Sequence, residues 1–596
     1  MRKTHNCGEL RAADVGKRVT LMGWVHRRRT HGGLVFVDIR DRWGLTQLVF
    51  NPSVNVAAHD VAEQCRLEYV ISATGTIAQR PEGTSNPSLP TGEVELVVDQ
   101  AEILNPAKTP PFDINQDTDV DEALRLRYRY LDIRRERMRD NLILRHRTVR
   151  LIRTWLDARG FLEVETPILV KETPGGAREF LVPSRLHAGH FYALPQSPQQ
   201  YKQLCMVAGV ERYFQIARCF RDEDLRSERQ PEFTQLDVEV SFVDEEDILQ
   251  LTEGLMTDLV DALGVKPLAA RPFPRLTYAE AMDRYGSDKP DLRFGLELTD
   301  LSDLAVESGF RVFQAVLSNG GRVKGIRAPG LGGYTRSQLD ELTRFAQARG
   351  ARGLATLAVT AEGLRGGISR NVTPEVAEAM VRRVAAEVGD LVLIVADRPE
   401  VVAETLGELR LEVGRRLGLM SKDTLYFAWV TDMPAFEWNP DRNAYQSKHH
   451  QFTSIVEEDR PLLETDPLAV RARQYDLVCN GYELGGGSIR IHRREDQAAI
   501  FKLIGLTDEQ AQSMFGHLLE AFEYGTPPHG GIALGIDRLT MLLAGRDSIR
   551  EMIAYPKTQS GTEPMTNSPQ PVAPDRLREL FIQVTEVEAK NGQGEK

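Results

Sequence analysis

The sequence predicts a multidomain α+β protein, in which a small N-terminal β-barrel precedes a larger antiparallel-sheet domain that is interrupted by an inserted α+β module. Its 596 residues are too many for one hydrophobic core, so two to four domains are expected. The first part of the chain alternates with a period of two, as strands do, whereas later parts mix such strands with amphipathic helices. This change along the chain predicts the mixed fold class.

Short strands and turns fill residues 1–105. The segments VTLMGWVHRRR, LVFVDIRD, LTQLVF, YVISATGTIAQR and VELVVDQAEIL give five alternating strands. Five such strands predict a barrel of the OB-fold type, which binds single-stranded nucleic acid by stacking and by a basic groove. Arg29, Phe36 and Gln47 supply a cation, a ring and an amide for that role. Taken alone, Phe36 would more often be a core residue and the arginine a surface one.

Five further segments follow the barrel. They are a Pro-rich linker and hinge (106–140), a first part of the antiparallel-sheet domain (141–275), an inserted α+β module (276–424), a second part of the antiparallel-sheet domain (425–556) and a C-terminal extension (557–596). Gly-rich stretches and alternating strands such as LVLIVAD mark the insertion, which lacks the dense charged motifs on either side. The extension is expected to pack on the body.

Composition excludes several classes of protein. Hydrophobic content of 41% and charged content of 27% are those of an ordinary soluble chain, and no apolar run is long enough to cross a membrane. The N-terminus lacks an apolar signal core, so a cytoplasmic protein without a membrane partner is expected. Five scattered cysteines without CxxC pairs indicate neither a zinc knuckle nor a disulfide framework.

A basic stretch interrupts the overall acidity of the chain. The net charge is −12, yet residues 125–150 hold ten arginines against three acids, which gives this stretch a charge of about +7. It could be a solvated helix face, but its position between two domains favours a surface for an RNA backbone.

Three separated stretches look suited to phosphate chemistry. FRDEDLRSERQPEFTQLDVEVSF (220–242) predicts two antiparallel strands joined by a loop, with Arg221 and Glu223 at one rim. GIALGIDRLTMLLAG (531–545) predicts a strand and a helix that begins near Asp537 and carries Arg538 in its first turn, where anions bind well. RLIRTWLDARGFLEVETPIL (150–169) predicts an amphipathic helix stopped by Gly160, then a strand ending at Thr166 and Pro167. A lone FRDE motif would indicate only surface salt bridges.

In order and spacing, these stretches resemble the three signature motifs of the class II aminoacyl-tRNA synthetases. Together with ALPQSPQQYKQ and GYELGGGSIRIH, they are similar in detail to the bacterial-type aspartyl enzymes. The resemblance covers nearly the whole chain and implies a class II synthetase catalytic domain. It also implies that L-aspartate is activated with ATP and transferred to the 3′ end of tRNA, and that the insertion is the GAD-like domain of those enzymes.

The resemblance assigns the ATP site. A carboxylate nucleophile is ionised at neutral pH and needs no general base, so the protein has to orient the reactants and neutralise phosphate charge. The catalytic residues implied are Arg221 at the α-phosphate, Arg538 at the γ-phosphate, and Glu223. The other residues implied to contact ATP are Asp222, Gln230, Glu483, Gly535, Ile536 and Asp537.

Asp476 and Glu483 are the expected Mg²⁺ ligands. They are seven residues apart in YDLVCNGYELGGGSIRIH, and this odd spacing would place them on opposite faces of one continuous strand. A common metal site therefore requires a turn, which Cys479 to Gly481 can supply. The counterparts of both residues in the family bind Mg²⁺ and ATP. Two ordinary strand-edge acids are the alternative.

Binding of aspartate requires a cation for its side chain and an acid for its ammonium group. Lys202 and Arg490 are the candidate cations, and the glycine run 485–487 is expected to leave room for a small ligand. Asp237, with Ser197, Gln199 and Gln235, is expected at the ammonium group. The resemblance adds Arg221, the loop residue Gly175, and His449, which closes over the aspartate. Two adjacent histidines could also suggest a metal site, but no further ligand is near in sequence.

Two positions depart from the family pattern. The family usually has a glutamate where this chain has Gly175, and a proline where it has Gln451.

The resemblance also bears on the tRNA partner and on assembly. Arg29, Phe36 and Gln47 match the positions that contact the anticodon. Enzymes that charge both tRNA(Asp) and tRNA(Asn) commonly carry a histidine and a glycine at two loop positions, where this chain has His31 and Gly83. A relaxed enzyme is therefore expected, with a strictly tRNA(Asp)-specific one as the alternative. The Gly160–Pro167 motif predicts a homodimer of isologous type.

Three rival functions share parts of this pattern. Asparaginyl- or lysyl-tRNA synthetases share the barrel and the phosphate residues, but the pocket of Lys202, Asp237 and Arg490 and the large insertion favour aspartate. A catalytically silent RNA-binding relative would be expected to lose Arg221, Glu483 or Arg538, which are all present. An ATP-dependent ligase for a free amine would not need residues 1–105.

Overall fold

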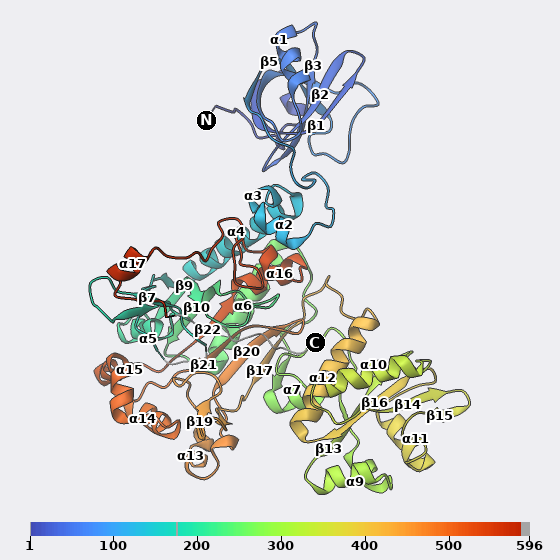
Figure 1. Ribbon diagram of the computed structural model, residues 1–596, viewed down its shortest axis with the longest axis vertical. Helices are drawn as coiled ribbons and strands as arrows, with labels where there is room; N and C mark the ends of the chain where they lie inside the picture. The colour runs from blue at the N-terminus through green and yellow to red at the C-terminus, as the bar shows by residue number, and fades with distance from the viewer. Residues whose placement is uncertain (1, 174–176, 586–596) are drawn as a thin grey trace. The chain divides into compact units, whose positions relative to one another are not determined.

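The computed structural model describes residues 2–173 and 177–585. They form two compact units: Met1–Ile143 with Ile553–Gln570, and Leu144–Met552 with the segment that begins at Pro571 (Figure 1). The six-part division expected from the sequence stays a prediction.

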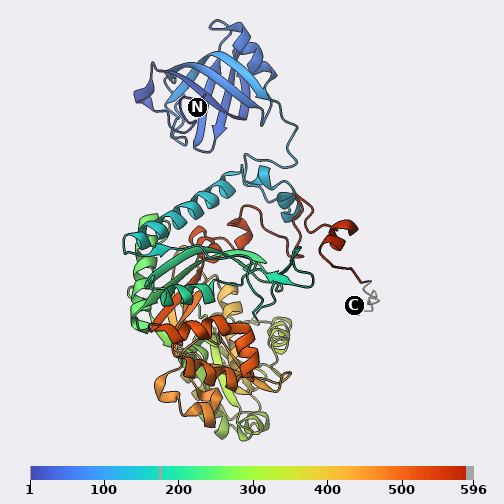
Figure 2. The same ribbon diagram turned by 90° about the vertical axis from the view of Figure 1, so that its left-hand side faces the viewer.

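The first unit begins with a closed five-stranded barrel, as the alternating segments predict. Its strands are β1 (Arg18–His31), β2 (Leu34–Asp41), β3 (Gly44–Phe50), β4 (Val70–Gln79) and β5 (Val94–Asn105), in the order β1-β2-β3-β5-β4, with α1 (Val56–Gln64) between β3 and β4. Figure 2 shows the blue strands wrapping around a common interior. Alternate residues are buried there from Val19 to Val25 of β1 and from Val35 to Ile39 of β2, so this part of the barrel core follows directly from the period-two pattern.

The helices α2 (Glu122–Arg127) and α3 (Arg129–Asp132) follow the barrel, and α4 (Glu136–Asp157) then runs into the second unit. Asp132 is fully buried and pairs with Arg125 (3.1 Å), Arg129 (2.6 Å) and Arg135 (3.5 Å). Arg129 also donates to the carbonyls of Ile553 and Ala554 at 2.9 Å.

The expectation that the basic stretch is an RNA surface is wrong for these three arginines. A buried carboxylate requires paired cations, and Asp132 takes them from the stretch.

The second unit is built on an eight-stranded sheet. Its strands lie in the order β11-β17-β20-β21-β22-β10-β9-β6, and the neighbours from β17 to β9 are antiparallel. The bounds are β6 (Leu162–Glu163), β9 (Arg212–Phe220), β10 (Glu232–Ser241), β11 (Arg275–Thr277), β17 (Phe427–Thr431), β20 (Gln474–Cys479), β21 (Tyr482–Ile489) and β22 (His529–Gly535).

Two of the sequence motifs take the shapes expected of them. The strands β9 and β10 are joined by the loop 221–231, and β22 leads into α16 (Ile536–Ala544), which carries Arg538 in its first turn. The strand after Gly160 is shorter than expected. It pairs in parallel with β9 only at Leu162 and Glu163, and a single further hydrogen bond from Val164 N to Phe214 O ends the pairing before Pro167.

The inserted module follows α7 (Tyr278–Tyr285) and has a five-stranded antiparallel sheet of its own. The strand order is β12 (Thr299–Asp300), β13 (Arg322–Ala328), β16 (Leu391–Asp397), β14 (Ala355–Thr360) and β15 (Gly363–Arg365). Successive residues of β16 enter two different cores, one under α8 (Ser302–Glu307), α9 (Arg311–Ser318) and α11 (Pro374–Arg383), the other under α10 (Arg336–Gln347) and α12 (Pro399–Arg416). Burial on both faces explains the continuous apolar run LVLIVAD.

The remaining elements surround the main sheet. They are the hairpins β7 (Leu181–Pro183) with β8 (Phe191–Ala193) and β18 (Phe436–Asn439) with β19 (Ala444–Ser447), and the helices α5 (Gln199–Val207), α6 (Glu245–Leu263), α13 (Leu462–Thr465), α14 (Arg494–Leu503), α15 (Asp508–Ala521) and α17 (Pro574–Glu579). Among the described residues, none of the helices combines the length and the apolar character that crossing a bilayer requires.

Candidate active site and nucleic-acid face

Three adjacent strands of the main sheet place the central side chains of the candidate site. In the ladder, Asp237 of β10 lies beside Ala533 of β22, and Glu239 lies beside Gly531. On the other side of β22, Gly531 pairs with Ser488 of β21. Asp237 and Glu239 share a face because they are two residues apart. The small residues of β22 between them and β21 leave that face open to long side chains from neighbouring elements.

Lys202 of α5 reaches this face and pairs with both acids. Its Nζ lies 3.0 Å from Asp237 Oδ1 and 3.4 Å from Glu239 Oε2, and all three residues are at most 1% exposed. Burial raises the pKa of the Asp237 carboxyl, against the effect of Lys202. Among the described residues, Asp237 Oδ2 has no hydrogen-bond partner although it is buried. A buried acceptor without a partner indicates a place for a cationic ligand group.

Arg490, just after β21, lies in the same buried network. Its Nε and Nη2 bind the two oxygens of Glu239 at 2.9 and 3.1 Å. Its Nη1 donates to Ser488 Oγ at 2.6 Å and to His450 Nε2 at 2.9 Å. Against the cost of burial, Arg490 and Lys202 lower the pKa of Glu239 to about 2. These bonds use four of the five N–H groups of Arg490, so one Nη2–H has no partner among the described residues.

The two histidines lie over this network. His449 Nδ1 is 3.2 Å from Thr453 Oγ1, which is in turn 3.1 Å from Ser488 Oγ. Burial and the nearby Arg490 lower the pKa of His449 to about 3, and burial lowers the pKa of His450 well below its usual range. Both rings are therefore neutral at pH 7.

The glycine run has a different role from the one expected. A Cβ at Gly485 would lie 1.9 Å from the carbonyl oxygen of Ala533, and one at Gly487 would lie 2.1 Å from that of Gly531. These two glycines let β21 approach β22, so the expectation that they leave room for a ligand is wrong. Gly486 faces Asp476 instead, with Oδ1 only 2.5 Å from a Cβ built there.

The phosphate end of the site is more open. Arg221 leaves the end of β9 half-buried, with its guanidinium 5.0 Å from the ring centre of Phe233. Arg538 donates to the backbone oxygen of Glu483. Both Arg221 Nε and Arg538 Nε are buried without a partner in the described parts of the chain. Two guanidinium groups with unused donors suit an anion with several oxygens.

Other predicted ATP residues lie near these arginines but differ in accessibility. Glu223 pairs with Arg229 at 3.3 Å, Asp222 is exposed, and Gln230 is buried. Ile536 is fully buried and Gly535 is half-buried at the start of α16.

Asp537 points inward, contrary to a direct role of its side chain at ATP. Its Oδ2 accepts from Thr234 N at 2.8 Å, and its Oδ1 pairs with Arg145. The carboxylate therefore fixes the start of α16 against β10 and α4.

Asp476 and Glu483 lie on a tight hairpin, as expected. Glu483 pairs with Val478, which is two residues from Asp476 and on the same face of β20. Burial and the charge of Glu483 raise the pKa of Asp476 well above its usual range. Two carboxylates that repel each other near the hairpin end of two central strands fit a divalent cation, which would relieve the repulsion.

The remaining pocket residues lie at the start of α5 and on β10. Ser197 is half-buried next to the first turn of α5, Gln199 donates to Gln203 at 3.1 Å, and Gln235 accepts from Cys219 Sγ at 3.3 Å. Gly175 lies outside the described residues.

Several residues of the network were missed from the sequence, with Glu239 the most important. The alternation in DVEV places Glu239 on the same face as Asp237, so this signal was available. His450 was noted from the sequence only as a neighbour of His449, and Ser488 and Thr453 carry no comparable signal, because their roles depend on contacts between distant segments.

The barrel brings its three predicted residues together. Arg29 pairs with Phe36 across β1 and β2, its guanidinium lies 5.4 Å from that ring, and it also bonds Gln47 Oε1. Gln47 is only 5% exposed and donates to Glu95 at 2.7 Å. His31, at the end of β1, and Gly83, with φ +80°, are both exposed.

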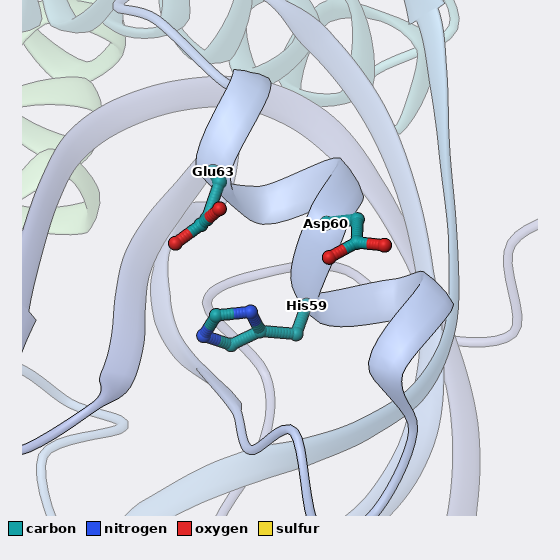
Figure 3. A group of neighbouring side chains, drawn as sticks. All are labelled: His59, Asp60 and Glu63. Atoms are coloured by element: carbon teal, nitrogen blue, oxygen red, sulfur yellow. The ribbon is translucent and has the colours of Figure 1, made fainter.

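A second group of possible metal ligands lies on α1 of the barrel (Figure 3). His59, Asp60 and Glu63 place ligand atoms within 4.8 Å of one another, and His59 Nε2 is 3.1 Å from the carbonyl oxygen of Gly33. Both acids are exposed, and exposed acids often lie this close without an ion, so we assign no metal to this group.

The comparisons with known proteins agree with this geometry. The model of the family "tRNA synthetases class II (D, K and N)" matches residues 121–559, and that of the "OB-fold nucleic acid binding domain" matches residues 19–104. The chain belongs to the class II tRNA synthetases of the D, K and N type.

Similar proteins cover this family member almost from end to end. The Aspartate--tRNA(Asp/Asn) ligase of Moorella thermoacetica is 59% identical over 99% of this chain and 98% of its own length. The protein of the same name from Syntrophomonas wolfei is 56% identical over 98% and 100%. A solved asparaginyl-tRNA synthetase from Pyrococcus horikoshii, 19% identical, matches 94% of this chain and 99% of its own with a TM-score of 0.59, which supports the fold alone.

Proposed function

We propose that this synthetase joins L-aspartate to tRNA in two ATP-dependent steps, and that it accepts both tRNA(Asp) and tRNA(Asn). The observation that carries the choice of amino acid is the buried network of Lys202, Asp237, Glu239 and Arg490. It offers the unbonded Oδ2 of Asp237 for an ammonium group and cationic N–H groups for a carboxylate. The names of the similar bacterial proteins point to the same substrates.

In the first step, the aspartate α-carboxylate would attack the α-phosphorus of ATP and release pyrophosphate. Arg221 would hold the α-phosphate and Arg538 the γ-phosphate, because both present unused N–H donors. Asp476 and Glu483 would hold Mg²⁺, which neutralises phosphate charge when it is bound. In the second step, a ribose hydroxyl at the 3′ end of tRNA would take the aspartyl group from the adenylate and release AMP.

A homodimer is part of the proposal. Apolar side chains that are exposed in the single chain gather on the segment around β6 and on the β7–β8 hairpin: Leu162, Ile168, Leu169, Leu181, Leu186, Phe191 and Tyr192. An apolar surface of this kind supports burial against a second copy of the chain. Gel filtration that gives an active monomer at micromolar concentration would contradict the dimer. We also propose a cytoplasmic location, where free tRNA and ATP are found.

The test is aminoacylation of purified tRNA(Asp) and tRNA(Asn) transcripts with labelled aspartate, in parallel with labelled asparagine and lysine. Aspartate on both tRNAs would support the whole proposal. Aspartate on tRNA(Asp) alone would support the assigned pocket but contradict the role of His31 and Gly83 in accepting tRNA(Asn). Charging with asparagine or lysine would refute the assignment of the pocket.

A further inference from the structure

Besides α7, where Asp283 pairs with Lys324 of β13, the loop of residues 286–295, which we call the clasp loop, connects the inserted module to the main sheet. On the side of the module, Arg410 of α12 binds this loop through hydrogen bonds. Its Nη2 donates to the carbonyl oxygens of Asp291 and Phe294, both at 2.7 Å, and its Nε to that of Gly295 at 3.0 Å. Its guanidinium also lies 4.2 Å from the ring centre of Phe294. Arg410 is 1% exposed, so these carbonyls would be left unpaired in its absence.

On its other side, the clasp loop contacts the turn between β20 and β21. Asp291, which is 1% exposed, binds Arg293 through Nε at 2.9 Å and Nη2 at 2.5 Å. Arg293 also donates to the carbonyl oxygen of Ser421 at 2.5 Å and to that of Asn480 at 3.5 Å. Asn480 is the first residue of the turn, so the Asp291–Arg293 pair connects the loop directly to it.

The turn itself is tightly fitted. Asn480 and Gly481 both have positive φ, +52° and +85°, as a two-residue hairpin turn requires. A Cβ at Gly481 would lie 3.4 Å from Asp291 Cβ, so the turn packs on the clasp loop. The Asn480 side chain accepts from Tyr426 N and donates to Thr424 O, both at 2.9 Å, which fixes the turn from the side of β17.

We infer that the inserted module positions Asp476 and Glu483 for the nucleotide and its metal, through Arg410, the Asp291–Arg293 pair and the Asn480–Gly481 turn. The inference rests on the proposed function. Glu483 follows the turn by two residues and Asp476 precedes it by four, so a shift of the turn moves both carboxylates. Arg410 and Arg293 are positioning residues, since they act through the turn.

The aspartate network provides an internal control. Ser488 and Arg490 lie at the opposite end of β21, and none of the clasp-loop contacts described above reaches them. The inference therefore predicts a selective effect. Loss of the clasp-loop hydrogen bonds should raise the concentrations of ATP and Mg²⁺ that the enzyme needs. It should leave the KM for aspartate nearly unchanged.

The experiment is aspartate-dependent ATP–pyrophosphate exchange with the full-length protein, at varied ATP, Mg²⁺ and aspartate. The variants are Arg293→Lys, which keeps a charge beside Asp291 but cannot also reach both carbonyls, and Arg410→Met. The matched control is Arg349→Met, because Arg349 pairs with Glu408 of α12 at 3.3 Å and stacks on Phe345 within the module.

We expect the KM for ATP and the half-saturating Mg²⁺ concentration to rise about 10-fold in Arg293→Lys and Arg410→Met, as for other residues that orient metal ligands. The KM for aspartate should stay within about twofold, and Arg349→Met should match the wild type in all three.

Each other outcome has a defined meaning. Equal losses for ATP and aspartate, or wild-type values in Arg293→Lys, would overturn the inference. If Arg410→Met fails to fold by circular dichroism, Arg293→Lys decides alone. Absence of aspartate-dependent exchange in the wild type would refute the proposed function instead.

Discussion

The two ends of β21 differ in how far the hydrogen-bond donors of their arginines are already bound by the protein. At the aspartate end, Arg490 is 2% exposed, and four of its N–H groups are already bound to Glu239, Ser488 and His450. At the phosphate end, Arg221 and Arg538 are half-buried and keep buried Nε groups without partners in the described residues. At the aspartate end most N–H groups of the buried cation are bound before substrate arrives, whereas at the phosphate end buried donors are still without partners in the part of the chain that the structure describes.

The difference follows from what each end has to bind. A small amino acid offers few contacts, so selectivity requires groups whose positions are already fixed by the protein. A triphosphate brings several charges and its own metal, and it can complete a site whose cations are still unsatisfied. The aspartate end should therefore be sensitive to small changes of geometry, and the phosphate end to loss of charge or of hydrogen-bond donors.

The replacement Arg490→Lys should have the largest effect. An ammonium cannot reproduce the fork that holds Glu239, and a buried charge left poorly paired costs about 3 kcal/mol or more, which is at least about 100-fold in kcat/KM for aspartate. The KM for ATP should change by less than about threefold. ATP–pyrophosphate exchange at varied substrate measures both values, with Arg473→Lys as the control, because Arg473 forms a surface pair with Asp244. Equal damage to both substrates would remove the contrast between the two ends.

Arg221→Lys should impair catalysis at the phosphate end. The lysine keeps the charge but loses the fork, and loss of one such contact to a charged transition state costs about 100-fold in kcat. Binding of labelled aspartate without ATP, measured by equilibrium dialysis, should be unchanged. Arg218→Lys is the control, since Arg218 lies on the same strand and pairs with Glu232 at the surface. Weaker aspartate binding in Arg221→Lys would show that Arg221 belongs to the aspartate end as well.

Much of the fold could be predicted from local patterns. The barrel strands, the β9–β10 pair and the β22–α16 junction follow from alternation, loop composition and a helix start, which are local properties. The β20–β21 hairpin was predictable because Cys-Asn-Gly can adopt a tight turn and the spacing of the two acids required one.

What could not be predicted depends on partners chosen by tertiary structure. The glycine run 485–487 looked like room for a ligand, but two of its members allow close strand approach. The arginines at 125, 129 and 135 looked like an RNA surface, but one buried aspartate engages all three. In each case the residue type fitted two roles, and only the neighbour across space decided between them.

The histidines over the aspartate end predict a pH effect on stability. The pKa of His449 is lowered to about 3 in the folded protein, against about 6.5 when unfolded. Below pH 6.5, the unfolded chain takes up a proton that the folded chain refuses, so stability falls as pH decreases toward 3.

The effect of one such histidine is at most about 1.4 kcal/mol per pH unit. Urea unfolding at pH 7.5, 6.5 and 5.5 should therefore show a shallower loss of stability in His449→Gln than in the wild type. His450 and His529 also have lowered pKa values, so part of the slope should remain. Identical slopes would mean that the His449 ring is not held neutral by its surroundings.

A similar contrast, between a buried side chain bonded within the protein and an exposed one, is found in the barrel. It gives the smallest expected effect. Gln47 is buried and bonded to Arg29 and Glu95, whereas His31 is exposed at the end of β1. His31→Ala should leave charging of tRNA(Asp) within about twofold and lower charging of tRNA(Asn) by about tenfold or less, the size of one lost base contact. Parallel aminoacylation of both transcripts measures this, with His5→Ala as a control in the same unit. An equal fall for both tRNAs would make His31 a general contact, so the open rim of the barrel would add affinity without choosing between anticodons.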